Sequence, residues 1–210
     1  MSRPRLVIAT HSAHKLRELR ELLELERGEL VSLDDLGITD DPEETGSTFR
    51  TNAAIKARFG ARATGLPTLA DDSGLEVDAL DGGPGVRTRR YSGPDATDAS
   101  NNELLLRDLD GLPAGRRGAR YVCVLALALP GEAGPRDGLR ILVRRGTCRG
   151  RIATELRGDG GFGYDPLFEP WSEPPGGETL GQWSAEAKNA ISHRSRAAAR
   201  MAPVLRSLGF

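Results

Sequence analysis

The two longest β-type segments of this 210-residue chain are close together in the sequence, and they constrain the fold more than any other feature. They span Arg120–Leu129 and Leu139–Glu155, and residues 130–138, rich in Pro and Gly, separate them. Two long strands joined by a turn-rich link are typical of an antiparallel pair. Shorter β-type segments that alternate with helical patterns predict a mixed sheet in an α/β fold. These segments are Arg5–Thr10, Thr68–Ala70 and Leu75–Leu80.

Apolar residues at helical spacing predict helices on both sides of this β-rich region. The expected helices contain Leu16 to Leu23, cover Ser47–Ala63, extend through Leu109 from a cap at Asp98 or Ser100, and cover Ser184–Leu208 with an interruption near Ser192. The length suits one large domain, so we expect a single domain over residues 1–210.

Charge and hydropathy argue against some classes of partner. The chain has 29 Lys and Arg residues against 30 Asp and Glu residues, so we expect no basic surface that holds nucleic acid. The longest apolar run, Val122–Leu129, is too short to cross a membrane, and no apolar signal segment follows Met1. A cytoplasmic protein with no nucleic-acid or membrane partner is expected. Cys123 and Cys148 lack metal-ligand spacing, and the sequence leaves a disulfide between them open.

Two adjacent carboxylates, Asp71 and Asp72, give the first indication of chemistry. With Ser73 and Gly74 after them, they are expected on a turn between two strands. There they can hold a hard divalent cation and direct a water molecule at a phosphate. The simpler alternative is a reverse turn whose side chains only satisfy local backbone groups.

The junction between the first strand and the first helix is typical of an anion site. It reads Thr10-His11-Ser12-Ala13-His14-Lys15. The first N–H groups of a helix can bind an anion, and Lys15 adds a positive charge that reaches phosphate oxygens. In the alternative interpretation, Ser12 only caps the helix and Lys15 is solvated.

A second polar segment surrounds the start of the helix expected at residues 47–63. Glu44 can supply a further carboxylate to a metal. Asn52 and Lys56 are four residues apart on one face of the helix, so we expect this amide and this amine to point together toward a cleft. Acidic residues are also common at helix starts for purely structural reasons.

Two later segments suit the recognition of a flat ring. In the Gly-rich loop Gly160–Pro166, Phe162 or Tyr164 can stack on a ring while Asp165 accepts a hydrogen bond. Further hydrogen-bond donors follow at Lys188, His193 and Arg194. The alternatives are a turn with aromatic residues in the core and an ordinary solvated helix face.

Taken in order, these motifs resemble the inosine triphosphate pyrophosphatases, also described as XTP/dITP pyrophosphatases. The resemblance covers nearly the whole chain and is carried by Leu6–Thr10, Glu43–Gly46, Thr48-Phe49, Asn52-Ala53, Lys56-Ala57, Ala70–Leu75, Pro84–Val86, Arg90–Gly93, Gly161–Pro166 and Ser192–Arg194. It implies an enzyme that hydrolyses ITP, dITP and XTP to the monophosphate and pyrophosphate with Mg²⁺, clearing deaminated purines. It also implies a two-lobed domain with a long mixed central sheet flanked by helices, an active site in the cleft between the lobes, and a homodimer.

The resemblance also implies roles for individual residues. Asp72 is expected to be catalytic, orienting or deprotonating the attacking water, and to bind Mg²⁺ together with Glu44, while Asp71 supports it. Donors from His193 and Arg194 would be satisfied by the C6 oxygen of hypoxanthine or xanthine and left unpaired by the amino group of adenine. The expected substrate-binding residues are Thr10, His11, Ser12, Ala13, His14, Lys15, Lys56, Ser73, Phe162, Gly163, Tyr164, Asp165, Lys188, His193 and Arg194.

One position departs from the family's pattern. Members have Thr-x-Asn-x-x-Lys after the first strand, and Ser12 occupies the Asn position here. Serine lacks the reach of the amide, so a weaker or water-mediated contact is expected. Two alternatives remain: a related pyrophosphatase for modified pyrimidine or methylated nucleotides, and a nucleotide sensor without hydrolysis. The Ser192–Arg194 and Phe162–Asp165 segments argue against the first, and the carboxylates argue against the second.

Overall fold

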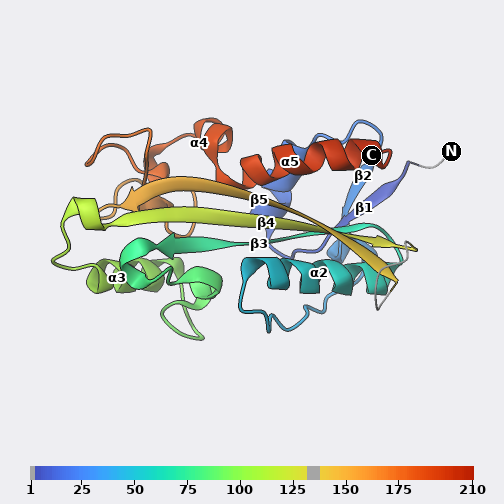
Figure 1. Ribbon diagram of the computed structural model, residues 1–210, viewed down its shortest axis with the longest axis horizontal. Helices are drawn as coiled ribbons and strands as arrows, with labels where there is room; N and C mark the ends of the chain where they lie inside the picture. The colour runs from blue at the N-terminus through green and yellow to red at the C-terminus, as the bar shows by residue number, and fades with distance from the viewer. Residues whose placement is uncertain (1–2, 132–137) are drawn as a thin grey trace. The chain divides into compact units, whose positions relative to one another are not determined.

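The computed structural model describes residues 3–131 and 138–210 (Figure 1). Residues 132–137 of the expected link, and Met1 and Ser2, lie outside the described residues. The chain divides into two compact units. The first unit comprises Met1–Asp72, Cys123–Gly146 and Arg194–Phe210, and the second comprises Ser73–Val122 and Thr147–His193. The expected single domain and the cleft between lobes stay predictions.

Within the described residues, a six-stranded sheet has the strand order β2-β1-β3-β4-β5-β6 (Figure 1). The strands are β1 (Arg5–Ile8), β2 (Glu29–Ser32), β3 (Thr68–Val77), β4 (Gly118–Pro130), β5 (Leu139–Ile152) and β6 (Phe168–Pro170). β1 pairs in parallel with β2 and with β3, whereas β5 pairs antiparallel with β6. The mixed sheet is therefore confirmed, and β4 and β5 are hydrogen-bonded neighbours. β2 and β6 were not expected from the sequence.

The acidic segment is part of a strand. β3 runs without interruption through Asp71 and Asp72, so the expected turn between two strands is wrong. Buried apolar residues on both sides of the pair keep this segment in the sheet. Consecutive side chains of a strand point to opposite faces. The two carboxylates therefore belong to different faces of the sheet.

Three helices of the first unit cover its part of the sheet: α1 (Ala13–Leu23), α2 (Phe49–Thr64) and α5 (His193–Ser207). Alternate residues of β4 form one core cluster with side chains of α1 and α5; they are Cys123, Leu125, Leu127 and Leu129. The intervening residues Val124, Ala126 and Ala128 are buried as well. Both faces of β4 are therefore covered, as in a sheet between helices.

α2 approaches β1 and β3 very closely. A Cβ atom added to Gly60 of α2 would be 2.6 Å from Thr68 Cγ2 and 3.4 Å from Ala9 Cβ. Thr68 is four residues before Asp72, so the two side chains share a face of β3. α2 consequently covers the face that carries Asp72.

The second unit has its own core around α3 (Asp98–Asp108) and α4 (Ala185–Ile191). α3 is capped by Thr97 in a reciprocal pair with Ser100, so neither of the two expected caps is correct. The predicted break near Ser192 is confirmed, because it separates α4 from α5. Short 3-10 helices occur at Asp34–Leu36, Asp78–Leu80, Gly85–Arg90, Ala114–Arg116, Asp165–Leu167 and Leu180–Gln182.

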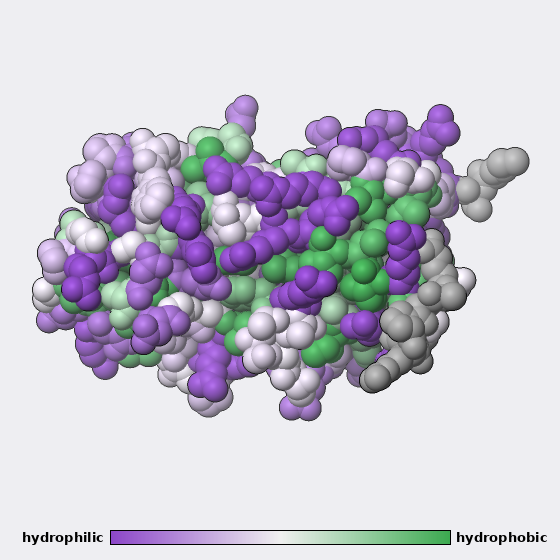
Figure 2. Space-filling view, viewed as in Figure 1, coloured by the Kyte–Doolittle hydropathy of each residue, from purple (hydrophilic) through white to green (hydrophobic). Residues whose placement is uncertain are grey.

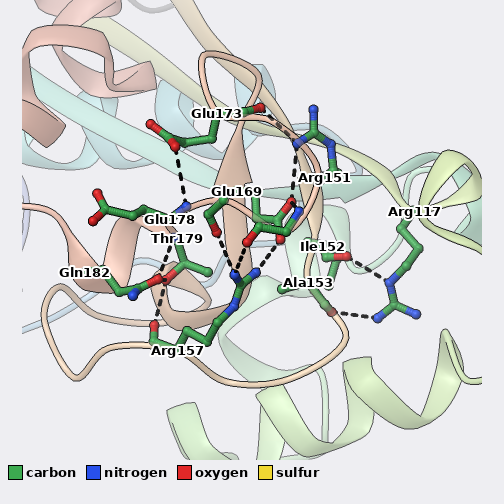
Figure 3. A network of polar contacts seen from close by, with 12 residues as sticks. Arg117, Arg151, Ile152, Ala153, Arg157, Glu169, Glu173, Glu178, Thr179 and Gln182 are labelled. Carbon is green, nitrogen blue, oxygen red and sulfur yellow. Dashed lines mark hydrogen bonds and ion pairs between the residues drawn. The ribbon is translucent and has the colours of Figure 1, made fainter.

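A buried ionic network holds the segments on either side of β6 (Figure 3). Glu169 of β6 is 3% exposed and pairs with Arg151 and with Arg157. Arg157 also donates to the carbonyls of Gly176 and Gly177, at 2.8 and 2.6 Å. A buried carboxylate is stable only when such partners satisfy it. This pairing ties Arg157, which precedes β6, and the Gly176-Gly177 segment, which follows β6, to the edge strand of the sheet.

Arg117 joins the start of β4, the end of β5 and the end of α3. It is 3% exposed, and its guanidinium donates to the carbonyls of Ile152, Ala153 and Leu109 at 2.8, 2.8 and 2.6 Å. Figure 3 shows the first two of these contacts. One side chain thus satisfies three carbonyl groups where β4 begins and where β5 and α3 end.

The thiols of Cys123 and Cys148 are both buried, and no disulfide joins them in the part of the chain that the structure describes. Over residues 3–131 and 138–210, no helix combines the length and the apolar character that a membrane span requires.

Replacing Arg117 with Met should destabilise the protein strongly. The substitution keeps an unbranched buried side chain but removes the donors of three carbonyl groups, each of which costs about 1–3 kcal/mol when it is left unsatisfied. We expect the free energy of unfolding, measured by urea denaturation, to fall by about 3 kcal/mol or more. The matched control is Arg116→Met, at an exposed position next to it, which should change stability by less than about 0.5 kcal/mol. Equal effects of the two substitutions would contradict this account.

Candidate active site

Asp71 and Asp72 are both buried in the middle of β3, with exposed fractions of 1% and 7%. Two adjacent carboxylates away from water require positive partners. Because they belong to opposite faces of the sheet, each has its own set of partners, and the two carboxylates are not chemically equivalent.

Asp71 is held as a carboxylate. Its Oδ2 is 3.1 Å from Lys15 Nζ and 3.5 Å from a nitrogen of Arg194, which is itself buried and also pairs with Glu18. Burial raises the pKa of Asp71, but the charges of Lys15 and Arg194 outweigh burial and hold that pKa well below its usual range. Asp71 is therefore poorly suited to accept a proton.

Asp72 has the opposite character. Its Oδ1 is 3.2 Å from Lys56 Nζ, whereas its Oδ2 is buried and has no hydrogen-bond partner among the described residues. Burial raises the pKa of Asp72 above its usual value, and the charge of Glu44 adds to this shift while Lys56 opposes it. A carboxylate with an available oxygen and a raised pKa is suited to accept a proton from water.

Lys56 connects Asp72 with Glu44. Its ammonium is 2.9 Å from Glu44 Oε1 and 3.2 Å from Asp72 Oδ1, so the two carboxylates are close enough to share one cation. Burial lowers the pKa of Lys56, but the charges of Asp71, Asp72 and Glu44 outweigh burial and raise that pKa. Lys56 therefore stays positively charged.

The start of α2 places Glu44 and Lys56. Thr48 caps the helix in a reciprocal pair with Thr51. One turn further on, buried Asn52 accepts the backbone N–H of Gly46 at 2.8 Å. A Cβ on Gly46 would be 2.4 Å from the amide oxygen of Asn52, so only glycine permits this contact. The amide expected to face a cleft beside Lys56 instead anchors the loop that carries Glu44.

The junction before α1 combines a helix cap with a charge. Ser12 is the N-cap of α1 and accepts the backbone N–H of Lys15 at 3.5 Å, while Thr10 accepts the N–H of Ser12 at 3.2 Å. The capping role considered for Ser12 is thus correct. Lys15, however, is not a solvated residue, because it pairs with Asp71. Ala13 and His14 are exposed in the first turn of α1.

His11 has a different environment from its neighbours. Its Nδ1 is 2.8 Å from Asp34 Oδ1, and its Nε2 is 3.6 Å from Asp41 Oδ1. Partial burial lowers the pKa of His11, but the hydrogen bond to Asp34 and the charge of Asp41 raise that pKa overall. The contact between His11 and Asp41 joins the junction before α1 to the loop that precedes Glu44.

The carboxylates of Glu44 and Asp72 fit a magnesium ion. No group of three or more His, Cys, Asp or Glu residues within the described ranges could hold a metal. Mg²⁺ does not require such a cage, because it is commonly held by one or two carboxylates together with water and substrate phosphates. Glu44 and Asp72 both contact the Lys56 ammonium, so they are close enough to bind one cation together. The buried Oδ2 of Asp72, which has no hydrogen-bond partner among the described residues, can serve as a metal ligand.

In the second unit, Asp165 is the centre of the Gly-rich loop. It is 4% exposed, and its Oδ2 accepts the backbone N–H of Phe162 at 3.0 Å and the ammonium of Lys188 at 3.2 Å. The Lys188 ammonium also lies 4.7 Å from the ring centre of Phe162, a cation–π contact. Gly161 has φ +75°, a conformation that favours glycine. A Cβ at this position would also lie 2.2 Å from Asp165 Oδ2, so both the backbone conformation and the space require glycine.

The two aromatic residues of this loop have different roles. Tyr164 is buried, and its hydroxyl donates to the carbonyl of Thr88 at 2.9 Å. Phe162 instead lies beside Lys188. Gly163 is tied to α3, with its N–H donating to Asp98 and its carbonyl accepting from Asn102. Of the two candidate rings, Phe162 is therefore the one suited to stack on a ligand.

The remaining residues predicted to bind substrate differ in their contacts. His193 begins α5, and its ring is stacked on Tyr121 of β4, with ring centres 4.8 Å apart. Ser73 is half-buried after Asp72. Arg194 was expected to donate to a base, and the structure brings its guanidinium to Asp71 and Glu18. Sequence spacing gave no signal for Tyr121 or Glu18, because both meet the site only through long-range contacts.

The chain is similar to known proteins over nearly its full length. The sequence model of the Ham1 family matches residues 6–204. The chain is 47% identical to a dITP/XTP pyrophosphatase of Nocardia farcinica, over 99% of this chain and 98% of that protein, and 47% identical to one of Methylococcus capsulatus, over 98% of each.

Solved structures give the same result. A HAM1 protein from Coxiella burnetii matches with a TM-score of 0.85 and 40% identity, over 97% of this chain and 99% of that one. A nucleoside-triphosphatase, dITP/XTP pyrophosphatase, from Mycobacterium abscessus matches with a TM-score of 0.76 and 43% identity, over 95% and 99% of the two chains. The match over nearly the full length and the shared fold show that this chain belongs to the Ham1 family.

Proposed function

We propose that this protein hydrolyses ITP, dITP and XTP to the nucleoside monophosphate and pyrophosphate, and so clears deaminated purines from the nucleotide pool. The observation that carries the proposal is the unequal environment of Asp71 and Asp72 in β3. Lys15 and Arg194 hold Asp71 ionised, whereas Asp72 has an available oxygen and a raised pKa. The names and high identity of the relatives from Nocardia farcinica and Methylococcus capsulatus support the same activity.

The proposed reaction breaks the bond between the α- and β-phosphates. Asp72 orients the attacking water toward the α-phosphorus and accepts its proton. Lys15 and Lys56 neutralise triphosphate oxygens, and the segment Thr10–Ala13 at the start of α1 contacts the phosphates. Glu44 and Asp72 would hold Mg²⁺. When bound, this ion supplies positive charge that stabilises the pyrophosphate leaving group.

Base selection is assigned to the Gly-rich loop and the segment around His193. Phe162 stacks on the purine, and the Asp165 carboxylate accepts the N1–H of hypoxanthine or xanthine. Adenine has an acceptor at N1 and a donor at C6, so it would leave both Asp165 and His193 without a matching partner. The role of Arg194 at the C6 oxygen stays a prediction, because its guanidinium already binds two carboxylates.

We further propose that residues 1–210 act as one catalytic domain, in a homodimer, in the cytoplasm. The hydrophobic area on the right of the face drawn in Figure 2 offers such a dimer an apolar surface to bury. The buried thiols of Cys123 and Cys148, with no disulfide between them, suit a reducing compartment. A related pyrophosphatase for modified pyrimidine or methylated nucleotides and a nucleotide sensor without hydrolysis are the two alternatives that substrate tests must exclude.

Replacing Asp72 with Asn should remove most of the turnover. Asn keeps the shape of the side chain but cannot accept the proton, so we expect kcat for ITP to fall by about 10²–10⁴-fold, measured as pyrophosphate release. Asp95→Asn, at an exposed position, is the matched control and should keep wild-type activity. Turnover of the Asp72 variant within tenfold of wild type, with an intact fold by circular dichroism, would remove Asp72 from its role.

Pyrophosphate release should require a divalent metal ion, and Glu44 should strengthen the binding of that ion. Excess chelator is expected to abolish pyrophosphate release, and added Mg²⁺ is expected to restore it. In Glu44→Gln one carboxylate ligand is lost, so the Mg²⁺ concentration for half-maximal activity should rise by about tenfold or more. Glu43→Gln removes an exposed neighbouring charge and should leave this concentration unchanged. Full activity in chelator would overturn the proposed metal, and equal effects of both variants would overturn the role of Glu44.

A further inference from the structure

Tyr121 of β4 contacts two of the residues proposed to recognise the base. It is buried, with 7% of its surface exposed, and lies in the second unit with its partners. Its ring is stacked on His193 at 4.8 Å between ring centres and 12° between planes. Its hydroxyl is hydrogen-bonded to the Asp165 carboxylate. One side chain therefore joins the loop that carries Asp165 to the segment that carries His193.

We infer that Tyr121 is a positioning residue for purine recognition, its hydroxyl orienting Asp165 and its ring orienting His193. This inference rests on the proposed function, because it assigns Tyr121 a role in the same site. Tyr121 itself need not touch the substrate.

The hydroxyl of Tyr121 acts as a donor over the whole working pH range. Burial raises the pKa of Tyr121 well above its usual value, and the neighbouring Asp165 charge adds to the shift, so the phenol stays protonated. Asp165 also accepts from Phe162 N–H and Lys188. These three donors fix the rotation of the carboxylate and stabilise its ionised form, although burial raises its pKa. An ionised, fixed carboxylate is the acceptor that a purine N1–H requires.

The ring of Tyr121 is itself held in place. Phe168 of β6 packs on it at 4.7 Å between ring centres, with 44° between planes. His193 lies on the ring in a nearly parallel stack, immediately after the break at Ser192 between α4 and α5. The stack on Tyr121 orients the His193 ring at this interruption between the two helices. It sets the plane in which the imidazole can donate to a purine oxygen.

Tyr121→Phe separates the two contacts, because it removes the hydroxyl and keeps the stacked ring. We expect the KM for ITP, and the dissociation constant of inosine monophosphate, to rise about tenfold or more, as for loss of a hydrogen bond to a charged group. The kcat and the affinity for pyrophosphate alone should stay within about twofold of wild type, since neither depends on base contacts. The matched control is Tyr91→Phe, which removes another tyrosine hydroxyl bonded to a carboxylate, that of Asp108, and should change none of these values.

A double-mutant cycle distinguishes positioning from packing. If Tyr121 acts through Asp165, adding Tyr121→Phe to Asp165→Asn should raise the dissociation constant of inosine monophosphate by less than about threefold further. The inference would be overturned if Tyr121→Phe raised the dissociation constant of inosine monophosphate by the same factor in the wild-type protein and in Asp165→Asn. It would also be overturned if Tyr121→Phe alone had the wild-type KM for ITP and the wild-type affinity for inosine monophosphate. A uniform loss of kcat, of affinity for the monophosphate and of affinity for pyrophosphate would also overturn it, because only a structural defect acts on all three.

Failure of the proposed function has a different signature. Wild-type protein that neither hydrolyses ITP nor binds inosine monophosphate would overturn the proposed function and this inference together. Wild-type protein that does both, with an unaffected Tyr121→Phe variant, would overturn this inference alone.

Discussion

The chemistry of the first unit depends on one constraint: two adjacent carboxylates in the middle of a buried strand must point to opposite faces of the sheet. Each face then supplies its own positive groups. α1 and the start of α5 provide Lys15 and Arg194 for Asp71, and α2 provides Lys56 for Asp72. Two identical side chains therefore have different acidities, which is how one site can contain both a fixed charge and a proton acceptor.

We propose a different role for the second unit, which is to hold donors and acceptors for a neutral ring. The buried Asp165 carboxylate is surrounded by donors, and the loop around it is fixed by the Arg157 and Glu169 pair and by the required Gly161. The energetic cost of burying these charges is offset because each has a partner. In our account the first unit carries out hydrolysis and the second unit chooses the base.

The sequence predicted the helices and long strands well, because their apolar patterns are local. It failed at Asp71 and Asp72, where an Asp-Asp-Ser-Gly segment has turn propensity but the buried residues on both sides keep it in the sheet. Candidate residues were found through their order along the chain. Their partners were not: the contacts of Arg194 with Glu18 and of His193 with Tyr121 join residues far apart in sequence, which no spacing rule reports.

The central claim is that this protein hydrolyses deaminated purine nucleoside triphosphates at the α-phosphate. The most direct measurement is pyrophosphate release by the purified wild-type protein with Mg²⁺ across ITP, dITP, XTP, ATP, GTP, CTP and UTP. The account predicts rapid release from ITP, dITP and XTP, and kcat/KM lower by about 10⁴-fold for ATP, whose base leaves buried polar groups unpaired. Preference for a pyrimidine triphosphate, or nucleotide binding without any pyrophosphate release, would contradict it.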